Sequence, residues 1–496
     1  MAFMNMISGI VSMSARPGLH VRIQNTKPSL LKAAIPRLQF HTTPRAAFSH
    51  KCSLETKSSD LSPTDKPRQR SGFYSEPTEY WKRVKVWHNV TAKDFMSYRW
   101  QVANTIDRKD KLVNFLSTVV PERIPQKRSS QNDTAPFQTR EEFLVNVVEG
   151  IKTAPMAIRL TPHILSVINW VDPVNDPVRC QFIPLKSGLL PDHPKLMLDS
   201  LQETTGSPVP GLVHRYPDKA LFLATSVCPV YCRFCTRSYA VGANTESVTK
   251  AAMKPIKRRW EAMFEYIEKT PAIQDVVVSG GDCYYLQPDH LQYIGERLLS
   301  IPNIKRFRLA SKGLAVCPMR ITDRSDGWTD SLVDLSNKGR QIGKQVALHT
   351  HFNHPAEITH ATELAARYLF HQGVTVRNQT VLLKGINDDF NTMSQLVRQL
   401  ADLNVQPYYV YQGDMISGVE DLRTPLSTIL ELEKRMRGTI AGFMMPAFVV
   451  DLPGGGGKRL ANSYETYDRD TGLSTWRAPG VAGDKVFKYY DPVRVQ

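Results

Sequence analysis

The chain has 496 residues, of which 42 % are hydrophobic and 22 % are charged, so it allows one large domain with additions or two to three smaller ones. No apolar run approaches the roughly 18 residues that a membrane-spanning helix needs, and seven cysteines are too few for a disulfide scaffold. These features exclude a helical membrane protein and a disulfide-rich secreted protein, whereas the net charge of +16 is compatible with nucleic-acid binding.

The amino-terminal segment carries part of that charge. Residues 1–54 contain seven Lys or Arg and no Asp or Glu, and they are rich in Ser, Ala and Met. This composition is typical of a mitochondrial transit peptide, so we predict one over residues 1–50 and a location in the mitochondrial matrix, with a disordered basic tail as the alternative. Residues 51–76 are predicted to be a disordered linker. The remaining charge excess is mild, and phosphate-bearing cofactors account for part of it, so we predict no nucleic-acid partner.

Residues 77–205 are predicted to form an amino-terminal helical region. Apolar and aromatic residues recur at helical spacing between Tyr80 and Val102, and two further helical patterns cover residues 141–152 and 162–170. A polar break separates these stretches over residues 122–140. Residues 171–191, which are rich in proline and polar residues, are predicted to be a connecting loop.

Strand and helix patterns alternate from residue 206 to 440. Six strands alternating with helices predict an α/β fold with a parallel sheet, curled as a partial (β/α)6 TIM-like barrel. The predicted strands cover residues 220–225, 275–279, 307–311, 346–349, 374–383 and 407–411. The predicted helices cover residues 250–268, 288–300, 329–338, 359–372, 390–403 and 425–437. Residues 441–496 are predicted to be a carboxy-terminal extension.

Three cysteines follow the first strand of the predicted barrel. Cys228, Cys232 and Cys235 form a C-x3-C-x2-C pattern, and cysteine thiolates are the usual ligands of iron–sulfur clusters. Three cysteines leave one iron of a four-iron, four-sulfur cluster without a protein ligand, so that iron can bind a reactant. A structural zinc site is the alternative, but it needs four ligands and no fourth cysteine lies nearby in the sequence. The pattern resembles the radical S-adenosylmethionine (SAM) superfamily.

A glycine run ending in a lysine is the second strong signal. Residues 453–458 read PGGGGK, and they lack the spacing of a phosphate-binding Walker loop. A lysine on such a loop has the freedom to form and later leave a Schiff base with pyridoxal phosphate (PLP). A flexible surface loop is the alternative interpretation.

Several motifs in order make the chain resemble the lysine 2,3-aminomutase family over roughly residues 90–460. These motifs are SYRWQVAN from Ser97, HRYPD from His214, CRFCTR from Cys232, SGGD from Ser279, THFNHPAEIT from Thr350, NQTVLLKGIND from Asn378, QPYYVYQGD from Gln406 and VVDLPGGGGK from Val449. The resemblance implies a radical SAM fold, SAM, PLP and a 4Fe-4S cluster as cofactors, a reductant for the cluster, and an isomerase that converts L-lysine to L-β-lysine.

The resemblance also implies roles for residues at matching positions. Lys458 would be the Schiff-base lysine. The residues implied to contact PLP are Arg215, Tyr216 and Tyr411, and those implied to lie near SAM are Gly280, Gly281, Asp282, His351 and Gln379.

Substrate choice depends on three further positions. Arg237 would bind the substrate carboxylate, and Asp414 and Asp451 would bind the distant ammonium of lysine, because a buried ammonium needs opposite charge. The alternatives are an aminomutase for another amino acid, a relative that modifies a lysine for attachment to a protein, and a cluster-bearing scaffold without mutase activity.

The chain departs from the family pattern at three places. Lys219 replaces the last arginine of the usual RYPDR, residues 311–314 read SKGL where SRTP is usual, and Asp389 stands where a zinc-binding cysteine of the family's bacterial members would lie. The second departure calls the SAM contacts of this segment into question. The tail has no cysteine, so we predict no structural zinc and, if the protein is a homo-oligomer, subunits held together in another way.

Overall fold

The computed structural model describes residues 78–125 and 138–493, all of which belong to a compact unit spanning residues 70–496. The predicted transit peptide and linker lie outside the described residues. None of the helices in the described ranges is long and apolar enough to cross a membrane.

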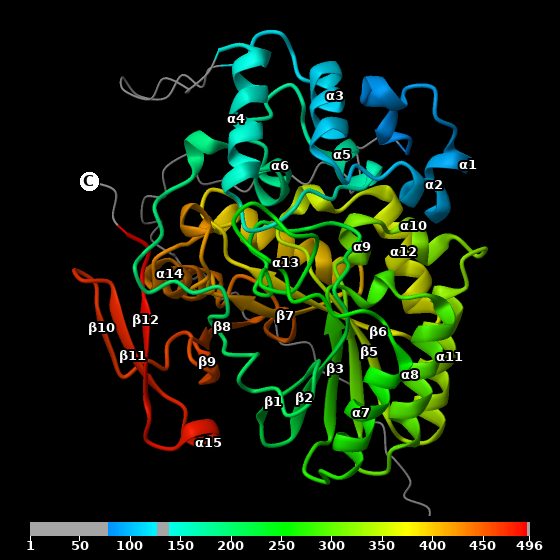
Figure 1. Cartoon of the computed structure of the whole chain (residues 1–496), viewed down its shortest axis with the longest axis vertical. Helices are drawn as coiled ribbons and strands as arrows, with labels where there is room; N and C mark the ends of the chain where they lie inside the picture. Colours follow the sequence, from blue (N-terminus) through cyan, green and yellow to red (C-terminus); the bar gives the residue numbers. More distant parts are fainter. Residues whose placement is uncertain (1–77, 126–137, 494–496) are drawn as a thin grey trace, which may run out of the picture. The chain divides into compact units, whose positions relative to one another are not determined.

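A nine-stranded sheet forms the centre of this unit (Figure 1). Its strands follow one another in chain order from β1 to β9, and the seven from β2 to β8 are parallel. The two edge strands, β1 and β9, pair antiparallel with their neighbours. The bounds are β1 Leu212–Tyr216, β2 Lys219–Thr225, β3 Asp275–Gly280, β4 Arg306–Ala310, β5 Gln345–Thr350, β6 Thr375–Val381, β7 Gln406–Tyr411, β8 Ala447–Leu452 and β9 Gly457–Leu460.

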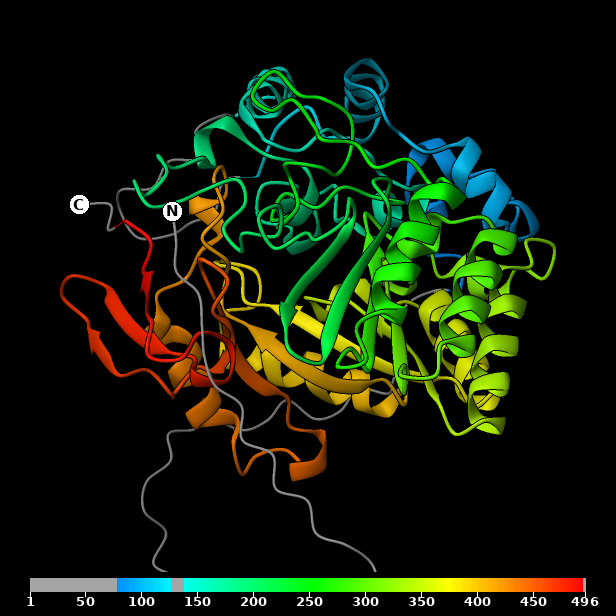
Figure 2. The ribbon, with the colours of Figure 1, turned by 60° about the horizontal axis from the view of Figure 1, so that its bottom comes forward.

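The six predicted strands are confirmed as β2 to β7, and the fold is a partial parallel barrel of the TIM-like type. The sheet is larger than predicted because β8 adds a seventh parallel strand and because β1 and β9 fold back as hairpin partners. Long helices connect the parallel strands, and they lie on the outer side of the curved sheet in Figure 2. They are α7 Lys257–Glu268, α8 Pro288–Ser300, α11 Trp328–Gln341, α12 His360–His371, α13 Phe390–Asp402 and α14 Leu426–Met436.

Local sequence explains where these helices begin. The helix predicted over residues 250–268 begins only at Lys257, because Pro255 disfavours helical conformation in the residue before it. Asp389 caps α13 by accepting hydrogen bonds from the backbone N–H groups of Asn391 and Thr392. Asp389 therefore has a structural role at a position where the sequence departs from the family pattern. Two short helices that were not predicted, α9 Gly313–Val316 and α10 Met319–Thr322, lie between β4 and α11.

The amino-terminal region is helical, as predicted. It contains α1 Ala92–Phe95, α2 Tyr98–Ala103, α3 Lys109–Val119, α4 Arg140–Thr153, α5 Pro162–Val167 and α6 Pro177–Phe182. The prediction of a plain loop over residues 171–191 was wrong, because α6 lies within it. Asp176 caps that helix by accepting from the N–H groups of Val178 and Arg179, and Pro177 occupies its first position, where a missing N–H costs nothing.

The carboxy-terminal tail forms a small second sheet of three antiparallel strands. These are β10 Thr466–Asp468, β11 Leu473–Arg477 and β12 Val486–Tyr490, with the short helix α15 Pro479–Ala482 between the last two. Tyr489 of β12 donates a hydrogen bond to the carbonyl of Gly413 over 2.8 Å and accepts one from the Gln412 side chain. The tail thus supports the loop that carries Asp414.

Candidate active site

Many of the predicted site residues stand at the carboxyl ends of parallel strands or just after them, whereas Arg215, Tyr216 and Lys458 lie on the antiparallel edge strands β1 and β9. The cysteine loop follows β2, the SGGD turn ends β3, the SKGL segment follows β4 and His351 follows β5. The carboxyl ends of the strands are where parallel barrels place their chemistry.

The cysteine loop, residues 226–243, is held by contacts with distant segments. The backbone N–H groups of Tyr231 and Arg233 donate to the carbonyls of Arg159 and Gln181 over 3.1 and 2.9 Å. The Arg233 guanidinium also forms a buried ion pair with Asp421, which follows β7, at 2.7 Å. The amino-terminal region and the β7 loop therefore fix the position of the three cysteines.

Burial raises the pKa of all three thiols, that of Cys228 well above its ordinary value and that of Cys232 to about 12. The thiols are therefore neutral at neutral pH until metal displaces their protons. Within the described ranges, no three His, Cys, Asp or Glu side chains converge as they would around a single metal ion. A four-iron cluster binds each thiolate through a different iron, so this donor set fits such a cluster without converging on one point.

Cys180 lies closer to this loop than its place in the sequence suggests, because it packs against the same small apolar cluster as Cys232. Its sulfur accepts a hydrogen bond from Arg179 over 2.8 Å and contacts the carbonyl of Val174. The contacts found for Cys180 are thus structural.

The glycines of the SGGD turn are required by the packing of the chain itself. Gly280 has a φ of +124°, and a Cβ at Gly281 would lie 2.5 Å from the carbonyl oxygen of Val227, at the start of the cysteine loop. Asp282 follows, with its carboxylate accepting from the N–H groups of Tyr284 and Lys312 over 2.8 and 2.7 Å. Burial raises the pKa of Asp282 to about 6. This turn therefore joins the ends of β2, β3 and β4.

Lys312, in the segment that departs from the family, forms a buried ion pair. Its ammonium lies 3.1 Å from Glu357 and donates to the carbonyl of His351 over 2.8 Å. The His351 ring contacts Asn353 through Nε2 at 3.0 Å and meets the ring of Phe234 edge to face. Burial and the Lys312 charge lower the pKa of His351 well below its usual value, so its imidazole is neutral.

Lys458 and Asp451 form an ion pair across the β8–β9 hairpin. They are direct cross-strand partners, and the Lys458 Nζ lies 2.7 Å from Asp451 Oδ2. Burial disfavours the ammonium, but the Asp451 carboxylate together with the Tyr411 and Tyr216 hydroxyls raises the pKa of Lys458 well above its ordinary value. The backbone N–H of Lys458 donates to the Tyr216 hydroxyl over 3.1 Å. The preceding Gly457 has a φ of +74°, and a Cβ added there would lie 2.9 Å from the Tyr216 ring. Only glycine therefore lets Tyr216 approach Lys458 in this way.

Unpaired cations surround Lys458. Arg215 and Lys219 have no carboxylate within ion-pair distance in the part of the chain that the structure describes, and Lys219 Nζ lies 3.6 Å from the centre of the Tyr216 ring. Burial and the nearby Lys458 charge lower the pKa of Lys219 to about 8. Two cations beside a reactive lysine fit an anionic ligand such as the phosphate of PLP. Tyr411 lies opposite, with its ring centre 5.5 Å from Lys458 Nζ and its hydroxyl 3.4 Å from Gln379 Oε1.

The two predicted ammonium-binding aspartates carry buried, unsatisfied oxygens. Oδ1 of Asp414 and Oδ1 of Asp451 have no hydrogen-bond partner among the described residues. Burial and the negative charge of Asp451 raise the pKa of Asp414 to about 7. Lys458 and Arg215 overcome the opposing effect of burial and lower the pKa of Asp451. Buried polar atoms are rarely left unpaired, so these oxygens indicate a place for a donor.

Arg237, the predicted carboxylate ligand, is already paired. Its Nε and Nη2 each donate to the Glu203 carboxylate over 2.8 Å, and the Tyr239 hydroxyl donates to the same carboxylate over 3.0 Å. Nη1 is the one guanidinium nitrogen of Arg237 that makes no hydrogen bond within the described ranges. Glu203 could not be predicted as a site residue, since nothing in its own stretch signals a partner 34 positions away.

A short segment that we call the strap, residues 197–203, links four parts of the site. Its Met197 exchanges backbone hydrogen bonds with the loop after Asp414, and its Ser200 carbonyl accepts from the N–H of Gly454 over 2.8 Å. The Leu201 carbonyl accepts from Arg215 over 3.0 Å, and Glu203 holds Arg237. The strap therefore connects the segments predicted to bind PLP, cluster and substrate.

We expect Glu203→Gln to lower the free energy of unfolding by about 3 kcal/mol, because it leaves a largely buried Arg237 without its counter-charge. Urea unfolding followed by circular dichroism measures this loss. The double variant Glu203→Gln/Arg237→Gln removes both charges and is expected to recover part of it. If the loss in the double variant equalled the sum of the losses in Glu203→Gln and Arg237→Gln, this coupling would be contradicted.

Comparison with known proteins finds relatives that are 2,3-aminomutases, although no protein-family model matches the chain. The chain is 38 % identical over 377 residues to the L-lysine 2,3-aminomutase of Clostridium subterminale, covering 76 % of this chain and 80 % of that protein. It is 34 % identical over 387 residues to the L-lysine 2,3-aminomutase of Bacillus subtilis, covering 77 % and 72 %. It is 30 % identical over 370 residues to the glutamate 2,3-aminomutase of Clostridioides difficile, covering 75 % and 77 %.

Proposed function

Because the chain belongs to the lysine 2,3-aminomutase family, whose members are isomerases, we propose that it converts L-lysine to L-β-lysine with PLP, SAM and a 4Fe-4S cluster. The amino group would move from the α-carbon to the β-carbon of free lysine. A reductant would supply the cluster with an electron.

The observation that carries the choice of lysine is the pair of buried carboxylate oxygens on Asp414 and Asp451. The ammonium of Lys458, 2.7 Å from Asp451, stands in for the ammonium of a substrate lysine. Engagement of Lys458 by PLP would free Asp451 to accept the substrate. A glutamate substrate would instead bring a second carboxylate toward two aspartates and be repelled.

Lys458, Arg215, Lys219 and Tyr216 would hold PLP, which when bound supplies a conjugated ring that delocalises an unpaired electron beside the amino group. Asp451 keeps a proton on Lys458 Nζ, so this nitrogen must release that proton before it can attack a carbonyl. Tyr216 positions the backbone of Lys458 through its hydroxyl.

Cys228, Cys232 and Cys235 would hold the cluster, and residues 280–282, His351 and Gln379 would face SAM. When bound, the cluster and SAM would supply the one-electron chemistry that activates the substrate's β-carbon. Arg237 would orient the substrate carboxylate through Nη1, while Glu203 fixes its guanidinium plane. These residues thereby place the substrate between the cysteine loop and Lys458.

The test is an anaerobic assay of the reconstituted protein with SAM, dithionite and either L-lysine or L-glutamate. We expect β-lysine from lysine and no β-glutamate. Turnover of glutamate or of another amino acid would overturn the substrate assignment. Absence of turnover with every free amino acid would favour a lysine-modifying enzyme or a scaffold.

The raised pKa of Asp414 predicts a pH dependence. Burial, Asp451 and Glu203 raise this pKa, while Lys458 and Arg215 lower it, and the result is about 7. Asp414 is therefore protonated below pH 7 and attracts the substrate ammonium only above it. We expect kcat/KM for lysine to rise through about pH 7. Asp414→Asn should abolish that rise and lower kcat/KM at pH 8 about a hundredfold. A persistent rise in Asp414→Asn would assign the titration to another group.

The raised pKa of Asp414 also makes the stability of the fold depend on pH, and this stability falls as pH rises. The folded state holds a proton on Asp414 that the unfolded chain releases near pH 4, so this group destabilises the fold as pH rises from about 4 to 7.

For residues 1–50 we propose import into the mitochondrial matrix, on the strength of their basic, acid-free composition. A fluorescent protein fused behind residues 1–54 should accumulate in the matrix. A cytosolic reporter would contradict the proposal.

A further inference from the structure

Cationic side chains surround the cysteine loop, and most of them have a carboxylate partner. The paired ones are Arg233 with Asp421, Arg237 with Glu203 and Lys312 with Glu357. Lys250 is different, because no carboxylate lies within 4 Å of its ammonium in the described part of the chain, although the residue is only 8 % exposed. A buried charge without a counter-ion is costly, so its presence calls for an explanation.

The Lys250 ammonium contacts residues that adjoin the cysteines. Its Nζ donates to the carbonyls of Ser238 and Pro155 and lies 4.0 Å from the sulfur of Met156. The N–H of Ser238 in turn donates to the carbonyl of Cys235 over 3.2 Å. Met156 belongs to the small apolar cluster against which Cys228 and Cys235 pack. Two backbone carbonyls thus hold the Lys250 ammonium beside residues that contact the cysteine loop.

The effects of burial and charge on Lys250 also link its ammonium to the cysteines. Burial lowers the pKa of Lys250, and a negative charge on Cys235 is the influence that raises it. A 4Fe-4S cluster with three thiolate ligands carries net negative charge, and that charge increases by one on reduction. A fixed cation therefore stabilises the reduced cluster more than the oxidised one.

We propose that Lys250 is a built-in counter-cation of the iron–sulfur cluster that raises the cluster's reduction potential. The proposal rests on the cluster assigned under the proposed function. The step is the uptake of one electron from an external one-electron donor, dithionite in the experiment below, which converts the 2+ cluster core to the 1+ core with no proton transferred. Lys250 forms no bond with the cluster in this step and influences it through its positive charge.

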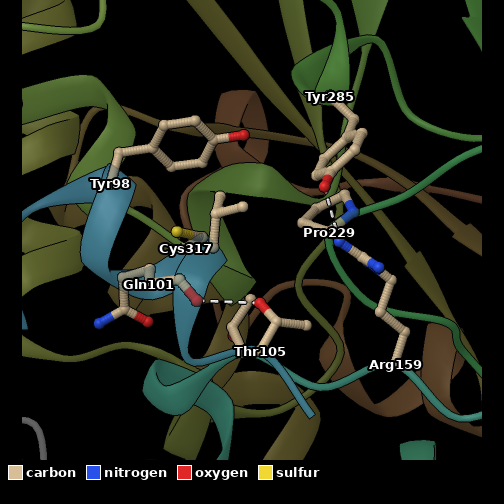
Figure 3. Close-up of a pocket in the computed structure, with 9 residues that line it drawn as sticks. Tyr98, Gln101, Thr105, Arg159, Pro229, Tyr285 and Cys317 are labelled. Atoms are coloured by element: carbon tan, nitrogen blue, oxygen red, sulfur yellow. Dashed lines mark hydrogen bonds between the residues drawn. The ribbon is translucent and has the colours of Figure 1, made fainter. Parts of the chain in front are cut away.

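Arg159 is a second cation near the loop, but its guanidinium is engaged and less buried. Figure 3 shows it beside Tyr285 and Pro229, with its Nη2 donating to the Tyr285 hydroxyl over 2.6 Å. The cavity that these residues line has a volume of about 10 Å³, which holds at most one water molecule. Solvent screens a partly exposed charge more than a buried one, so Lys250 is the stronger candidate.

The test compares three variants of the full chain after anaerobic reconstitution. Lys250→Gln removes the charge but keeps an amide that can donate to the same carbonyls, and Lys250→Arg keeps the charge. Lys344→Gln is the matched control, since the Lys344 ammonium also donates to two carbonyls, those of Leu299 and Ile301, at 2.7 Å each. Lys344 precedes β5, at the opposite end of the sheet from the cysteine loop.

The readouts are iron and sulfide content and the midpoint potential from an EPR-monitored titration. In Lys250→Gln we expect the ratio of reduced to oxidised cluster at a fixed potential to fall about tenfold, which corresponds to about 59 mV for a one-electron couple. Lys250→Arg and Lys344→Gln should match the natural chain. An unchanged potential in Lys250→Gln would overturn the proposal.

Loss of the cluster is also informative. If Lys250→Gln fails to retain iron while Lys250→Arg retains it, the charge is needed to hold the anionic cluster and the proposal stands. If both lose iron alike, Lys250 has only a structural role and the proposal is wrong. If the natural chain itself binds no iron and sulfide, the proposed function fails instead, so the two failures are distinguishable.

Discussion

The variant Lys458→Arg is expected to lose at least about ten-thousandfold in kcat, as removal of an essential catalytic group does. Arginine keeps a positive charge beside Asp451, so the ion pair across the β8–β9 hairpin is retained. A guanidinium does not form the covalent bond with PLP that Lys458 is proposed to form. The visible absorbance of covalently bound PLP should therefore vanish, while the urea midpoint of unfolding stays near that of the natural protein.

Lys458→Ala separates the chemical role of this lysine from its charge. It should show the same loss of absorbance and activity, and it should also be less stable, because Asp451 is left buried without a partner. Retention of the PLP absorbance in either variant would assign the cofactor to another lysine. Equal stability of the two variants would contradict the importance of the ion pair for the fold.

Cys235→Ala is expected to abolish cluster binding and all turnover, because a cluster already short of one protein ligand would be left with two. Iron and sulfide analysis and the EPR signal after reduction measure the loss. Cys317→Ala is the matched control, since Cys317 is a buried free cysteine outside the loop. We expect this variant to keep its cluster.

The three loop cysteines should also behave alike. Cys228→Ala and Cys232→Ala are expected to give the same loss as Cys235→Ala. A variant of one loop cysteine that still holds a complete cluster would show that another residue serves as ligand, and Cys180, which packs near Cys232, would be the first to examine.

The barrel could be predicted from sequence because its strands and helices have strong, alternating apolar patterns. The edge strands β1 and β9 were missed, since each is short and depends on its hairpin partner. Helix α6 was missed in a proline-rich stretch, although Asp176 and Pro177 form a recognisable start signal. The carboxy-terminal sheet has short strands whose pairing depends on tertiary contacts such as those of Tyr489.

In the candidate site, too, some features could be predicted from sequence and others could not. Residues in motifs, such as Lys458 and Asp451, could be named from sequence, but their ion pair could not, because it depends on cross-strand register. Glu203 was missed because a charge pair between distant segments leaves no local pattern. The SGGD glycines were implied to lie near SAM, and the structure shows that Gly281 lies close to the backbone of Val227.

The hairpin between β8 and β9 has a consequence for how the proposed cofactors would bind. In the chain alone, Asp451 neutralises Lys458 and burial keeps the three loop cysteines as uncharged thiols. Folding therefore does not require PLP or iron to balance charge at either centre. The proposed cluster would then displace the thiol protons as it binds, and Schiff-base formation between Lys458 and PLP would release water.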